Sequence, residues 1–163
     1  MDRLDWKIIG QLESNGRQSF AELGERIGLS KSPCWSRVKS LEERGIIEGY
    51  GARLDPSSLG LAVQSFVEVQ IRFDAHSEFE AAVVAHAAVV ECHTTAGESD
   101  YLLKIFTRSA EHLDELLRHH LSKLPGVQRM KTVVCLKTIK RQGNLTEWAK
   151  ATETRGRPEA HLG

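Results

Sequence analysis

The spacing of apolar residues changes after the first third of the chain, and this change constrains the fold most. Leu4, Ile8 and Leu12 recur at the interval of an amphipathic helix. In Val63–Phe73, by contrast, apolar and polar side chains alternate, which is typical of a half-buried antiparallel strand. The turn-forming stretch Asp55–Gly60 separates the two patterns. A chain of 163 residues with this pattern is predicted to form two small domains.

The N-terminal part is predicted to form three helices. The first two cover about residues 2–13 and 19–27. Ser19, followed three residues later by Glu22, matches the capping box that often starts a helix. Gly28 lies where a C-terminal glycine is expected. These signals place a short second helix directly before the third.

The third helix is predicted to begin with Ser32 as its N-cap and Pro33 in its first position. Cys34, Val38 and Leu41 share one face of this helix and are expected in the core. The opposite face combines hydroxyl, aromatic and basic side chains, with Arg37 at its edge: Ser32, Trp35, Ser36, Lys39 and Ser40.

A short helix, a tight turn and a helix with such a polar face are the pattern of a helix-turn-helix. Hydroxyl and lysine side chains on such a helix can reach base edges in the major groove. Lys31–Leu41 contains three basic residues and no acid, although the 22 basic and 22 acidic residues of the whole chain cancel. Ile46–Leu54, with two glycines, is expected to be extended and to form a wing. The alternative is a plain three-helix bundle whose polar face meets solvent.

The C-terminal part is predicted to have the element order βαββαβ. Its strands are expected at about 63–73, 89–95, 101–107 and 130–139, and its helices at about 77–87 and 111–124. This order is the ferredoxin-like arrangement, so the chain is predicted to be an α+β protein. The helices would cover one face of the sheet. Because the other face carries apolar side chains such as Phe66, a dimer through that face is predicted.

These patterns divide the chain into four predicted segments. They are a winged helix-turn-helix domain at 1–55, a linker at 56–62, a ferredoxin-like domain at 63–140 and a C-terminal extension at 141–163. The extension is expected to be a helix fragment followed by a mobile tail. No apolar run approaches the ~18 residues needed to span a bilayer, and the first ten residues are too acidic for a secretory signal. A cytoplasmic protein is therefore expected.

Signatures of catalysis and of metal binding are weak. The three cysteines are far apart and form no CxxC pair, so neither a disulfide framework nor a zinc site is predicted. His112, Glu115 and His119 share a helix face, but it lies opposite a leucine stripe and should be solvated. Neither a phosphate loop nor a nucleophile elbow is present. The sequence therefore predicts neither an enzyme nor a cofactor or metal.

Three motifs together resemble the leucine-responsive/asparagine regulator (Lrp/AsnC) family. Ile27–Ile47 is similar to the turn and recognition helix of that family, including an unusual Pro-Cys pair. Thr95–Leu103 contains a Gly-x-x-Asp-Tyr pattern similar to its effector loop. Leu124–Val127 follows, leading to Thr132 and Lys140. The resemblance covers nearly the whole chain apart from the tail.

This resemblance implies a bacterial or archaeal transcription regulator that senses a small effector, an amino acid. The residues implied to contact DNA are Lys31, Ser32, Pro33, Trp35, Ser36, Arg37, Lys39 and Ser40. Trp35 is bulkier than the residue that many relatives place there. A homodimer is implied, with tetramers or octamers as larger assemblies. Two recognition helices related by a two-fold axis would fit a pseudo-palindromic operator.

The residues implied to bind the effector are Gly97, Glu98, Asp100, Tyr101 and Thr132, at a contact between dimers. Backbone amides of the loop can hold a carboxylate, and Asp100 can pair with an ammonium group. A simple hairpin turn is the alternative for this loop. An alternative for the whole chain is an amino-acid-binding module that acts on a protein partner in trans. DNA binding should weaken steeply with salt, whereas a protein contact of mixed charge should not.

Overall fold

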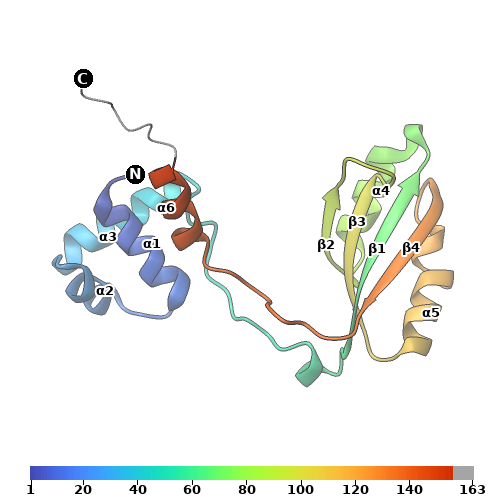
Figure 1. The fold of residues 1–163 in the computed structure, drawn as a ribbon, viewed down its shortest axis with the longest axis horizontal. Coiled ribbons are helices and arrows are strands. Elements are labelled where there is room, and N and C mark those ends of the chain that lie inside the picture. Colours follow the sequence, from blue (N-terminus) through green and yellow to red (C-terminus); the bar gives the residue numbers. More distant parts are fainter. Residues whose placement is uncertain (156–163) are drawn as a thin grey trace. The chain divides into compact units, whose positions relative to one another are not determined.

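The computed structural model describes residues 1–155, so the expected tail at 156–163 lies outside the described residues. The chain divides into two units (Figure 1). One unit combines Met1–Arg53 with the chain from Lys140 onward, and the other is Leu54–Ile139. No helix within residues 1–155 has both the length and the apolar content needed to span a membrane.

The first unit is helical, with α1 (Arg3–Ser14), α2 (Phe20–Ile27), α3 (Lys31–Glu43) and α6 (Leu145–Arg155). Its core is made by apolar residues of the first three helices: Ile8, Leu23, Ile27, Cys34, Val38 and Leu41. The predicted apolar face of the third helix is thus buried. Burial of apolar surface contributes about 25 cal/mol per Å² and is the main interaction that holds these short helices together.

The capping signals of the first two helices have the expected roles. Asp2 caps α1, and its side chain accepts hydrogen bonds from the amides of Leu4 and Asp5. The Ser19–Glu22 capping box at α2 is formed in both directions. The helix then stops because its C-cap, a glycine, adopts a left-handed conformation with φ of 79°.

One local prediction in this unit is wrong. The N-cap of α3 is Ser30, not Ser32, so Pro33 occupies the third helical position. Proline is tolerated there because the first amides of a helix have no acceptor in the preceding turn. The first backbone hydrogen bond of the helix runs from the Cys34 amide to the Ser30 carbonyl, one residue after the proline. Residues 46–54 form no strand, since a strand needs a partner for its backbone hydrogen bonds.

Helix α6 packs on α1 and gives part of the C-terminal extension a structural role. The Glu13 carboxylate accepts hydrogen bonds from the amides of Leu145, at 2.6 Å, and Thr146, at 3.0 Å. Burial raises the pKa of Glu13, but these bonds and one from the Thr146 hydroxyl outweigh it and hold the pKa below its usual value. A Cβ at Gly10 would lie 3.4 Å from Thr146 Cγ2, which is an ordinary van der Waals contact. Glu13 thus supplies acceptors to the first amides of α6.

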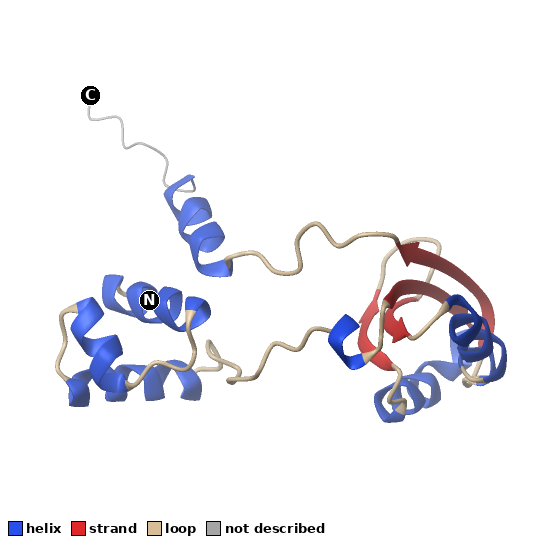
Figure 2. Cartoon of the chain, turned by 90° about the horizontal axis from the view of Figure 1, so that it is seen from below, coloured by secondary structure: helices blue, strands red, loops and turns tan. Residues whose placement is uncertain are grey.

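The second unit has the predicted βαββαβ order and is an α+β domain. Its elements are β1 (Val63–Ile71), α4 (His76–Ala85), β2 (Val89–Thr94), β3 (Tyr101–Thr107), α5 (Ala110–His119) and β4 (Val127–Cys135). The strands are antiparallel in the order β2-β3-β1-β4. Both long helices lie on one side of the sheet (Figure 2).

Alternation in the strands decides which side chains enter this core. Val67 and Val69 of β1 pair with Leu103 and Tyr101 of β3, and all four are buried under the helices. The ends of the strands differ from the prediction. Phe73 lies beyond β1 in a short 3₁₀ turn and is 94% exposed. The last strand covers residues 127–135 instead of 130–139, because its pairing with β1 begins opposite Ile71.

Candidate DNA and effector sites

The exposed surface of α3 contains most of the predicted DNA-contacting residues. Seven of the eight are exposed: Lys31, Ser32, Pro33, Trp35, Ser36, Lys39 and Ser40. Within residues 1–155, the serines and Lys31 have no side-chain hydrogen bond or ion pair. Lys39 Nζ lies 5.7 Å from the centre of the Trp35 ring, which is within the range of a cation–π contact. Trp35 itself is 49% exposed. The face therefore presents polar groups that are available to another molecule.

Arg37 is separated from this set by its ion pairs with α1. Its Nη1 atom lies 2.6 Å from Asp2 Oδ2 and 2.8 Å from Asp5 Oδ1. Arg44 approaches the second Asp5 oxygen at 3.7 Å. The hydrogen bond to Asp2 comes first among the causes that raise the pKa of Arg37. The guanidinium thus ties the recognition helix to the start of α1. Arg37 can reach Asp2 and Asp5 because it lies at the edge of the polar face of α3.

In the loop between β2 and β3, Asp100 is engaged within the domain. Its Oδ2 atom accepts a hydrogen bond from the Ile71 amide at 2.8 Å, and its own amide donates to the Val69 carbonyl at 3.0 Å. The Thr95 amide donates to the Asp100 carbonyl at 2.9 Å. Asp100 therefore fixes the loop to the end of β1, and one of its carboxylate oxygens is already occupied.

Tyr101 points into the core under α4 and is 1% exposed. Its hydroxyl donates to Glu80 Oε1 at 2.7 Å and lies 2.8 Å from His76 Nδ1. Its ring packs on Phe79 with the ring centres 4.6 Å apart. Burial, then the contact with Glu80, raises the pKa of Tyr101 to about 12. This side chain connects the effector loop to a helix.

The other three residues of the predicted effector set lie in different places. Gly97 and Glu98 are exposed at the tip of the loop, where the Glu98 carbonyl accepts a hydrogen bond from the Gln70 side chain. Thr132 is paired with Val67, so it lies on the helix-covered face, and β1 separates it from Tyr101. One chain therefore does not bring the five predicted residues together.

A small hollow beside the loop involves residues that the sequence analysis missed. It has a volume of about 20 Å³ and is lined by Glu68, Gln70, Glu98, Ser99, Arg129 and Lys131. Lys131 Nζ lies 3.4 Å from Glu68 Oε2. Glu68 and Gln70 are polar positions in the alternating pattern of β1. That Arg129 and Lys131 of β4 lie beside them depends on how the two strands are paired, which the sequence does not show. In a single chain this hollow is far smaller than the roughly 300–1,000 Å³ of a typical small-molecule site.

Two family descriptions match this chain. Residues 1–48 match the winged helix-turn-helix DNA-binding family, and residues 64–145 match the Lrp/AsnC ligand-binding domain. The leucine-responsive regulatory protein of Salmonella typhimurium is 38% identical over 148 residues, covering 89% of this chain and 90% of that protein. The chain belongs to the Lrp/AsnC family.

Solved structures of this family have the same fold. A transcriptional regulator from Neisseria meningitidis, in complex with L-Met, has a TM-score of 0.84 at 38% identity, covering 88% of this chain and 95% of that chain. The structure of E. coli AsnC has a TM-score of 0.78 at 25% identity, covering 88% and 97%. This Lrp/AsnC protein is therefore a helix-turn-helix transcription regulator with a ligand-binding domain, and not an enzyme.

Proposed function

We propose that this regulator reads DNA with the exposed face of α3 and responds to an amino acid held beside the loop at 97–100. The observation that carries the proposal is the set of exposed basic and hydroxyl side chains on α3, of which Lys31 and the serines have no hydrogen-bond or ion-pair partner within residues 1–155. Hydroxyl and lysine side chains suit the mixed donors and acceptors of the major groove. Arg37, held by Asp2 and Asp5, orients the helix and does not contact bases.

The amino acid is proposed to bind where more than one subunit contributes. The family neighbour from Neisseria meningitidis is an L-Met complex, which supports this ligand class. The hollow beside the loop combines carboxylates with Arg129 and Lys131, and these groups suit the two charges of an amino acid. Because the hollow is small in one chain, a second subunit must enlarge or complete it. The loop amides at Gly97 and Glu98 would hold the carboxylate.

Dimerisation is proposed through the face of the sheet that no helix covers. Phe66 of β1 lies opposite Lys104 of β3 and Val133 of β4 on this face, and Val133 is 48% exposed. An apolar patch rimmed by charged side chains is characteristic of a contact surface. A two-fold dimer would present two copies of α3 to a pseudo-palindromic operator. Tetramers or octamers would be built from such dimers.

The test is a mobility-shift titration of the full chain on DNA upstream of its own gene, with each amino acid added in turn. We expect a specific shift that weakens with salt and that one or a few amino acids alter. Absence of any shift at low salt, with folded protein, would contradict DNA binding and favour the trans-acting module. Lys7→Ala, an exposed lysine on α1, is the matched control for substitutions on α3.

Three variants separate the parts of the proposal. Asp100→Ala should retain basal DNA binding but lose the response to the amino acid, and a normal response would contradict the loop assignment. Phe66→Glu should yield monomers in sedimentation velocity, because a charge would enter the apolar interface. Val84→Glu on α4, at a residue that is 88% exposed, should leave the dimer intact. If Val84→Glu also yielded monomers, the result would contradict the proposed interface.

A further inference from the structure

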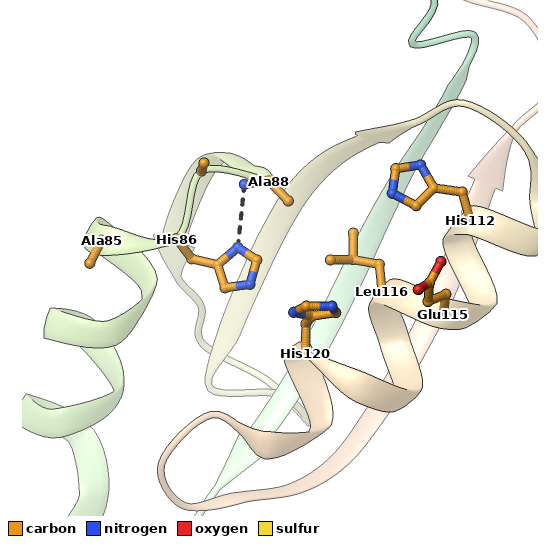
Figure 3. A pocket seen from close by; sticks show the side chains of 8 residues that line it. Ala85, His86, Ala88, His112, Glu115, Leu116 and His120 are labelled. Carbon is orange, nitrogen blue, oxygen red and sulfur yellow. Dashed lines mark hydrogen bonds between the residues drawn. The ribbon is translucent and has the colours of Figure 1, made fainter.

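A second site lies among three histidines on the helix layer of the ligand-binding domain. A cavity of about 410 Å³ opens between the end of α4 and one face of α5 (Figure 3). Ala85, Ala87 and Ala88 border it, and Leu116, which is 5% exposed, lies at its base. The titratable groups that line it are His86, His112, Glu115 and His120. Neither DNA recognition by α3 nor the loop at 97–100 uses these residues.

The cavity is remote from the loop within the same domain. It adjoins Ala88, directly before β2 begins at Val89, whereas the loop at 97–100 follows the other end of β2. The strand of six residues therefore separates the two places. A ligand in this cavity would not occupy the site proposed for the amino acid.

Backbone hydrogen bonds decide which ring nitrogens carry protons. The Ala88 amide donates to His86 Nδ1 at 3.3 Å. The Arg108 amide donates to His112 Nδ1 at 3.2 Å. A neutral imidazole that accepts at Nδ1 carries its proton at Nε2. Both rings therefore offer an Nε2–H donor, and neither offers a free Nε2 lone pair to a metal ion.

The third ring completes the set of donors. His120 faces His86 across the cavity, with ring centres 6.1 Å apart and the rings nearly perpendicular (Figure 3). In the described part of the chain, no hydrogen bond engages the His120 ring. It can therefore take whichever tautomer a ligand requires. Three imidazoles and one carboxylate thus surround a space with apolar walls.

We propose that this cavity binds a small oxyanion, a phosphate or carboxylate group, on the ring N–H groups of His86 and His120, whose ring centres lie 6.1 Å apart. Glu115 at the rim would accept a hydrogen bond from a hydroxyl or ammonium group on the same molecule. Charge-assisted hydrogen bonds of this kind are stronger than neutral ones. Within residues 1–155, no group of three or more metal-ligating side chains has the arrangement for a metal ion, which agrees with the proton positions.

The test follows the histidine ring ¹³Cε1–¹H resonances of the full chain while inorganic phosphate and acetate are titrated separately at constant ionic strength. Single His→Gln variants assign the resonances. For at least one of the two anions, we expect saturable shifts of His86 and His120 with a Kd of about 1 mM or tighter. His119 is the matched control, because it neighbours His120 on α5 but does not line the cavity.

Variants then distinguish a specific site from general ion binding. The double variant H86Q/H120Q should weaken binding by about tenfold or more, whereas H119Q should leave it unchanged. Circular dichroism spectra that match the parent chain would show that both variants are folded. Equal, unsaturable shifts of all histidines, including His119, would overturn the proposal. A response to Zn²⁺ without one to either anion would also overturn it, because it would require the ring lone pairs that the backbone amides occupy.

Discussion

Helix α3 and the loop between β2 and β3 both carry prominent polar residues, but they use them in opposite ways. On α3, Lys31, Ser36 and Ser40 are exposed, and their side chains have no hydrogen-bond or ion-pair partner among the residues that the structure describes. In the loop, Asp100 accepts a hydrogen bond from the Ile71 amide, and the next side chain, Tyr101, is buried against α4. The helix leaves its polar groups to a partner molecule, whereas the loop uses them to hold itself.

This difference teaches how each site tolerates substitution. A polar group without an internal partner can be removed at little cost to folding. A polar group that satisfies a buried donor cannot, because the donor then loses its acceptor. Substitutions in the loop should therefore lower the free energy of unfolding, whereas those at the exposed lysines and serines of α3 should change DNA binding alone. Four variants test this contrast, in order of decreasing effect on stability.

The largest loss is expected from Asp100→Ala. The substitution leaves the amide of Ile71, a residue that is 7% exposed, without its acceptor. The free energy of unfolding should fall by about 1–3 kcal/mol, measured by urea denaturation. Asp100→Asn is the matched control, since it keeps an acceptor oxygen, and it should lose much less. Equal stability of the alanine variant and the parent would show that the loop does not depend on this bond.

A smaller loss is expected from Tyr101→Phe. The variant removes a hydroxyl that donates to Glu80 and lies beside His76. It should lower the free energy of unfolding by about 0.5–1.5 kcal/mol near neutral pH, measured by urea denaturation. The packing of the Tyr101 ring on Phe79 is unaffected by this change, so a fall much larger than this would mean that the ring had moved.

The same tyrosine predicts how stability depends on alkaline pH. Its pKa in the folded protein is raised to about 12, above the ordinary value of 10.0. The stability that it contributes is therefore complete below pH 10 and is lost as the pH rises through about 12. Tyr101→Phe should remove this part of the alkaline loss. The part due to Tyr50, whose pKa is also raised to about 12 by burial and by Glu42, should remain.

Local sequence signals predicted most of the fold. The Ser19–Glu22 capping box and the alternation of β1 depend on neighbouring residues, and both have the expected structure. The start of α3 was misplaced by two residues because Ser30 and Ser32 are both good capping residues. Sequence could not choose between them, since proline is tolerated at several positions of a first helical turn.

The candidate sites were less predictable because their contacts are distant in sequence. Arg37 meets Asp2 and Asp5 across more than thirty positions, and no local pattern identifies those partners. The engagement of Asp100 with Ile71 depends on how β1 and β3 are aligned. The burial of Tyr101, however, could have been inferred, because Leu103 and Ile105 follow it on the same face of the strand.

Arg37→Ala tests a residue that departs from this contrast, because Arg37 lies on α3 but is engaged in ion pairs within its own unit. It removes the ion pairs with Asp2 and Asp5, so the Tm should fall measurably, but less than for Asp100→Ala. Asp5→Asn should act through the same contacts, and the effects of the two changes combined should be less than additive. Differential scanning calorimetry of both single variants and the double variant provides the measurement. Full additivity would mean that Arg37 and Asp5 stabilise the unit independently.

Lys39→Ala should have the smallest effect on folding and a clear effect on binding. Within the described residues, its ammonium group has one interaction, with the Trp35 ring at 5.7 Å from the ring centre, so the free energy of unfolding should change by less than about 0.5 kcal/mol. DNA affinity should fall on every sequence, and the slope of log K against log salt should decrease in magnitude by about 1, the loss of one phosphate contact. Fluorescence anisotropy across a salt series measures both quantities, with Lys7→Ala as the control. An unchanged slope would remove Lys39 from the phosphate contacts, and a large loss of stability would erase the contrast with the loop, because α3 would then also depend on its polar side chains for folding.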